Sequence, residues 1–104
     1  MEEFSIIYKI LRILQKSMDY DEVDVRLISA SALGISQNKW IRMMKMLADN
    51  GYIEGVCIVN VDGASSIIQL NNPMITLKGL EYLGENSLMK KAKDIAMGIL
   101  SAAT

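Results

Sequence analysis

Histidine is absent from this sequence of 104 residues, and cysteine and proline occur once each. With no histidine and a single thiol, Cys57, the chain cannot form a Cys/His zinc site, a Cys–His catalytic pair or a Ser–His–Asp triad. It also lacks a phosphate-binding glycine loop. Cys57 falls in an apolar stretch typical of a strand, where a thiol is expected to be a small, inert core residue. We therefore expect no catalytic residue, no cofactor and no enzymatic activity.

The chain has no excess of charge of one sign, because 11 Lys and Arg against 12 Asp and Glu leave a net charge of −1. It thus lacks the basic character that favours tight nonspecific binding to nucleic acid. Residues 18–24 hold four acids but not the EF-hand pattern, so we expect no metal site. Met1-Glu2-Glu3 is unlike a signal peptide, and no apolar run reaches the roughly 18 residues that span a bilayer. We expect a cytoplasmic protein that does not enter the membrane.

The length corresponds to about one domain, and no linker or repeat divides the chain, so we expect a single domain over residues 1–104. Residues 2–17 have apolar side chains at helical spacing and are predicted to form a first helix. The wide stripe is typical of a central core helix, or of one whose extra edge meets a second subunit. It consists of Phe4, Ile7, Leu11 and Leu14, widened by Ile6, Ile10 and Ile13.

The strongest local signal is a helix over residues 36–50. Ser36 is a favourable N-cap, and Asn50-Gly51 provides a stop because glycine tolerates the left-handed turn. Before it, Ser29 caps a short helix that ends at the tight turn Gly34-Ile35. A helix, a glycine turn and a second capped helix are typical of a helix-turn-helix, whose second helix is the recognition helix. We expect its buried stripe to be Trp40, Met43, Met44 and Leu47.

Residues 52–70 contain two β-rich stretches separated by Asp62-Gly63, a hairpin turn signal. Asn71-Asn72-Pro73 is expected to end the second strand, since proline cannot donate to a ladder. A recognition helix that runs directly into a hairpin is typical of a winged helix-turn-helix, in which the hairpin is the wing. Residues 25–28 are expected to form a further short strand.

Two C-terminal helices are predicted over residues 76–102. Thr76 caps the first, which has Gly84 near its end, and Ser87 caps the last. The last helix has an apolar side with few helices left to cover it, so we expect a homodimer through this C-terminal helix, to which the first helix could add. That side consists of Leu88, Ala92, Ile95, Ala96 and Ile99. The expected fold class is α+β and mostly helical: a winged helix-turn-helix with a small β-hairpin wing and an additional C-terminal helix.

The flank of the recognition helix that faces away from its buried stripe offers side chains suited to DNA. Glutamine and asparagine pair with adenine and arginine with guanine in the major groove, and the early positions of such a helix reach base edges. We therefore expect Gln37, Asn38 and Arg42 to read bases. Lys39 and Lys45 are candidate phosphate contacts, although any solvated helix face carries side chains of this kind.

Other features favour a protein partner over DNA. The wing tip, residues 60–65, has no Lys or Arg and carries an acid. Few phosphate contacts mean weak, salt-limited binding by a monomer, which a dimer would strengthen. Ile41 and Met46 are expected on the outward flank of the recognition helix, where apolar side chains suit a protein surface better than a base edge.

Several motifs carry a resemblance to a known family over nearly the whole chain. They are Ile28-Ser29-Ala30, Ala32-Leu33-Gly34-Ile35-Ser36, Trp40, Asp49-Asn50-Gly51-Tyr52-Ile53 and, most distinctively, Ile75-Thr76-Leu77-Lys78-Gly79-Leu80-Glu81-Tyr82-Leu83 followed by Glu85-Asn86-Ser87-Leu88-Met89. Taken together, they resemble the YjcQ family, small proteins of Gram-positive bacteria and their phages. The resemblance implies a winged-helix fold with an extra C-terminal helix, and it supplies no catalytic residues.

Two hypotheses of function follow. The first is a small winged-helix DNA-binding protein, a transcriptional regulator of bacterial or phage origin whose partner is double-stranded DNA. The alternative is a protein–protein interaction module that keeps the winged-helix fold without binding DNA.

Overall fold

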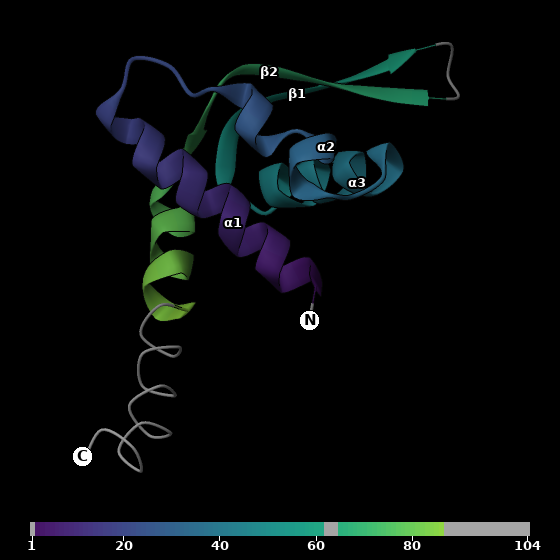
Figure 1. Cartoon of the computed structure of the whole chain (residues 1–104). Helices are drawn as coiled ribbons and strands as arrows, with labels where there is room; N and C mark the ends of the chain where they lie inside the picture. The colour runs from purple at the N-terminus through teal and green to yellow at the C-terminus, as the bar shows by residue number, and fades with distance from the viewer. Residues whose placement is uncertain (1, 62–64, 87–104) are drawn as a thin grey trace, which may run out of the picture.

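The computed structural model of the chain describes residues 2–61 and 65–86. Helices come first, a β-hairpin follows, and residues 77–86 are again helical (Figure 1). The elements are α1 (Glu2–Lys16), the 3-10 helices η1 (Ser17–Asp19) and η2 (Val25–Ile28), α2 (Ala30–Leu33), α3 (Gln37–Asp49), β1 (Ile53–Val61) and β2 (Ser65–Ile75). The α+β winged helix-turn-helix is thus confirmed. The Asp62-Gly63 turn and the last helix, residues 88–102, lie outside the described residues.

The core lies between α1 and α3 and is closed by one end of the hairpin and by the 77–86 helix. The predicted stripe of α3 is buried in full. On α1 the buried stripe is centred on Ile10 and Leu14, whereas Phe4, which was expected inside, is 54% exposed in the first turn. The buried residues are Ile6, Ile10, Leu11, Leu14, Ile28, Trp40, Met43, Met44, Leu47, Ile53, Ile75 and Leu83.

Trp40 is held in the core by a hydrogen bond as well as by the packing of its indole ring. Its indole Nε1 donates to the backbone oxygen of Ile28 at 2.7 Å, in buried surroundings. A buried donor and a buried acceptor each cost free energy when left unpaired, so this bond fixes where η2 lies on α3. The side chain of Ile28 is itself fully buried.

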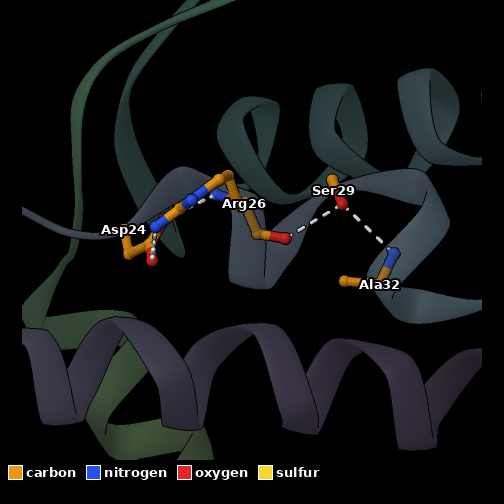
Figure 2. A network of polar contacts seen from close by, with 4 residues as sticks. All are labelled: Asp24, Arg26, Ser29 and Ala32. Atoms are coloured by element: carbon orange, nitrogen blue, oxygen red, sulfur yellow. Dashed lines mark hydrogen bonds and ion pairs between the residues drawn. The ribbon is translucent and has the colours of Figure 1, made fainter.

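Residues Val25–Ile28 form the 3-10 helix η2, so the predicted short strand is wrong. Asp24 is the reason, because its carboxylate accepts the backbone N–H of Arg26 at 3.1 Å and its backbone oxygen accepts that of Leu27 at 3.0 Å. The same carboxylate holds the Arg26 guanidinium at 2.9 and 3.0 Å (Figure 2). These bonds, the guanidinium first and the backbone N–H second, lower the pKa of Asp24. Local capping here outweighs the β-propensity of two branched side chains.

The strands β1 and β2 form an antiparallel hairpin whose ladder runs back to the pair Ile53–Ile75. Asn71-Asn72-Pro73 does not end β2 as predicted, because pairing resumes beyond these residues. They form a bulge opposite Gly55, whose φ is +82°, and a Cβ there would lie 2.7 Å from the backbone oxygen of Asn71. Residues in a bulge stand outside the ladder, so the missing N–H of proline breaks no ladder bond.

Cys57 is exposed on β1, so its predicted place in the core is wrong. The ladder pairs it with Gln69, and the next pair on that face, Val59 and Ile67, is 40% and 49% exposed. The face that carries Val56 packs against the core instead. Because successive side chains of a strand point to opposite faces, a shift of one position decides between core and solvent.

The start of β1 is tied to the start of the last described helix. Thr76 caps that helix, because its Oγ accepts the backbone N–H of Gly79 at 3.1 Å. The same hydroxyl donates to the backbone oxygen of Gly51, and the N–H of Thr76 donates to that of Tyr52 at 3.1 Å. Gly79 lies so close to this backbone that a Cβ would stand 2.6 Å from Cγ1 of Ile75 and nearer still to the Tyr52 oxygen.

The substitution Trp40→Phe removes the donor to the buried Ile28 carbonyl and leaves a void beside it. We expect it to lower the free energy of unfolding by about 2–3 kcal/mol, measured by urea denaturation. Tyr20→Phe, at an exposed aromatic residue, should change the same quantity by less than about 0.5 kcal/mol. A loss that small in Trp40→Phe would show that the indole bond contributes little.

The substitution Gly79→Ala should destabilise the fold by about 1–3 kcal/mol, because its methyl group has to displace backbone and Ile75. Gly84→Ala is the matched control in the same helix, with nothing within 4 Å of the added carbon. It should stabilise by up to about 1 kcal/mol through helix propensity alone. Thermal unfolding followed by circular dichroism separates the two, and effects of the same sign and size would contradict the close approach at Gly79.

Candidate nucleic-acid interface

Two serine caps and a glycine turn shape the helix-turn-helix. Ser29 caps α2, since its Oγ accepts the backbone N–H of Ala32 at 3.1 Å and donates to the backbone oxygen of Arg26 at 2.9 Å (Figure 2). Gly34 ends α2 in the left-handed region, with φ +71°. Ser36 then caps α3 by accepting the backbone N–H of the third residue of that helix at 3.1 Å. These local bonds fix the angle at which α3 leaves the turn.

All five residues predicted to contact DNA lie on α3, and three of them share one line along it. Asn38, Arg42 and Lys45 follow one another at spacings of four and three, opposite the buried stripe, and all three are exposed. Gln37 is also exposed, at the first position of the helix. We call Asn38, Arg42 and Lys45 the outward line of α3.

Lys39 lies apart from the outward line, because its side chain turns toward α1. Its Nζ is 3.1 Å from a carboxylate oxygen of Glu3, and the side chain is 33% exposed. A hydrogen bond from its own backbone N–H, followed by the contact with Lys39, lowers the pKa of Glu3. The partner Glu3 could not be predicted from the sequence, since no local pattern links residues that are 36 positions apart.

The remaining cations of α3 differ in how far they are neutralised. Lys45 Nζ lies 3.7 Å from the carboxylate of Asp49, one turn further along, and both side chains are largely exposed. Such a surface pair is worth only a few tenths of a kcal/mol and yields readily to a phosphate. Within the described part of the chain, Arg42 makes no ion pair. Arg42 is therefore the charged side chain of α3 most available to a ligand.

The hairpin brings no positive charge to this surface. Residues 53–75 contain no Lys or Arg at all, and Glu54 is the charged residue among those of them that are described. Its outer face is apolar at Val59 and Ile67 instead. Figure 1 shows the hairpin extending past α2 and α3, so an arm without Lys or Arg lies beside α3.

The two apolar residues expected on the outward flank of α3 have different environments. Ile41 is partly buried and packs against the core, so its predicted place on the DNA-facing flank is wrong. On the helix surface Ile41 lies beside the four buried residues of α3, so the side of α3 that packs against the core is wider than predicted. Met46 is 46% exposed and remains on the outside.

The described residues hold no group of three or more His, Cys, Asp or Glu placed to bind a metal ion. None of the helices in this part of the chain has both the length and the apolar character that crossing a membrane requires. The surface of α3 therefore remains the candidate site, offering an arginine, a lysine and two amide side chains for hydrogen bonding.

Comparison with known proteins adds a family. The model of the YjcQ protein family matches residues 8–99, from the middle of α1 through the hairpin and the helix that follows. No curated protein and no solved structure matches the chain. On this match the chain belongs to the YjcQ family.

Proposed function

We propose that this protein binds double-stranded DNA through α3 and serves as a small transcriptional regulator of bacterial or phage origin. It would act by binding and not by catalysis. One observation carries the proposal. The side chains of the outward line are exposed and can form hydrogen bonds, and they lie on α3, the second helix of the helix-turn-helix. In known helix-turn-helix proteins the residues at the start of this helix contact base edges.

The chemistry of the α3 surface suits the major groove. Gln37 and Asn38 stand in the first turn and can each make two hydrogen bonds to adenine. Arg42, one turn further along the same flank, can make two bonds to guanine. Lys45 would exchange its weak partner Asp49 for a phosphate, and Lys39 would do so only by leaving Glu3.

The number of charges bears on affinity and on assembly. Because the hairpin has no Lys or Arg, one copy would neutralise few phosphates, and its binding would be weak at physiological salt. Two copies on adjacent half-sites double the contacts. We therefore propose that the protein works as a homodimer, formed through the C-terminal segment, in keeping with the symmetric half-sites that helix-turn-helix proteins use.

A second candidate function rests on the hairpin. Its exposed Val59 and Ile67, together with Met46 on α3, offer an apolar surface without positive charge, which suits a protein partner better than DNA. In that case a partner copurified from the native host would be lost on Ile67→Ser and retained on Arg42→Ala. If the protein instead binds DNA through α3, DNA binding should be lost on Arg42→Ala and retained on Ile67→Ser.

Arg42→Ala should weaken DNA binding about tenfold or more, because a bidentate arginine contributes about 1–3 kcal/mol. Fluorescence anisotropy at low salt against a library of genomic fragments measures this. Arg12→Ala, at an exposed arginine of α1, is the matched control and should leave the Kd unchanged. Equal affinity of the Arg42→Ala protein, or no binding of the unaltered protein to any fragment, would contradict the proposal.

A further inference from the structure

A groove with apolar walls lies where α1 ends and η2 begins. It has a volume of about 460 Å³ and is lined by Ile13, Ser17, Tyr20 and Leu27 among others. Leu27 is 51% exposed although it is a large aliphatic residue. A concave apolar surface of this kind is typical of a site that another chain segment covers.

The chain segment that borders this groove is acidic. Glu22 and Asp24 line the groove, and Asp19 and Asp21 belong to the same connecting segment. Against them stand Lys16, which also lines the groove, and Arg26, which is paired with Asp24 at 2.9 Å. Four acidic residues against two basic ones give the segment from residue 16 to residue 26 a net charge of −2.

Residues 87–104 have the complementary chemistry. Three lysines, Lys90, Lys91 and Lys93, stand against the single acid Asp94. The apolar side of this segment, Leu88 to Ile99, repeats at helical spacing and would be about 18 Å long as a helix. An apolar stripe flanked by lysines matches an apolar groove that is bordered by a segment of net negative charge.

The segment that fills the groove comes from another copy of the chain. In Figure 1 the 77–86 helix runs away from the segment that connects α1 to η2, which borders the groove. A tail that continued in the direction of this helix would lead away from the groove of its own copy. We propose that residues 88–99 of each copy occupy the groove of the other, an inference that rests on the homodimer proposed above. One groove and one tail per copy close the assembly at two.

The test of the groove is a matched pair of exposed aliphatic residues. Leu27→Ser should weaken dimerisation at least tenfold in sedimentation equilibrium. Ile67→Ser, of nearly equal exposure on the hairpin, should leave the dimer constant unchanged. Leu27 lies outside the core, so the fold is expected to survive, which circular dichroism checks. A chain ending at residue 86 that is monomeric while Leu27→Ser stays fully dimeric would overturn the groove assignment.

A disulfide test decides which copy supplies the tail. In a Cys57→Ser background, a chain with Leu27→Cys is mixed with a chain with Ile95→Cys under mild oxidation. The mixed disulfide should form at least tenfold faster than with Val59→Cys in place of Leu27→Cys. Equal rates, or a monomeric unaltered protein, would overturn the proposal. Arg42→Ala should leave dimerisation unchanged, so DNA binding and dimerisation can fail separately.

Discussion

The hydrogen bond from the indole of Trp40 to the carbonyl of Ile28 is the constraint around which the helical part is arranged. Ile28 ends η2, so the bond holds the entrance of the helix-turn-helix against the helix that presents the candidate site. The indole ring and the Ile28 side chain fill the space between α3 and α1. With α3 fixed on this side, its outward line is turned toward solvent. Fold and candidate site thus depend on one buried donor and one buried acceptor.

A second constraint joins the two ends of the hairpin. Thr76 bonds to Gly51 and Tyr52 and caps the following helix, while Gly79 allows that helix to lie directly against the Tyr52 backbone. Two of the motifs that carry the family resemblance, residues 49–53 and 75–83, therefore meet in space. Their residues are explained by this junction, and a catalytic or binding role is not needed to account for them.

Local signals in the sequence predicted the helix-turn-helix well, because the caps at Ser29 and Ser36 and the stripe of α3 depend on neighbouring residues. Predictions were wrong where distant or competing contacts decide. Asp24 turns a β-prone segment into η2, and the bulge at Gly55 carries β2 past its proline. For the candidate site, the five residues were placed on α3, but the ion pair of Lys39 with Glu3 depends on tertiary packing and left no local signal.

The bulge opposite Gly55 also divides the hairpin into two mechanically distinct parts. The pair Ile53–Ile75 behind it is buried in the core, whereas the pairs beyond it form an arm whose inner face, at Val56, Ile68 and Leu70, is only partly buried against the core. Since a bulge absorbs changes of twist, the arm can be lengthened or shortened by whole cross-strand pairs without moving the helices. Relatives with the same helical core could thus differ in the length of the hairpin, because a change of length in the arm would disturb the core least.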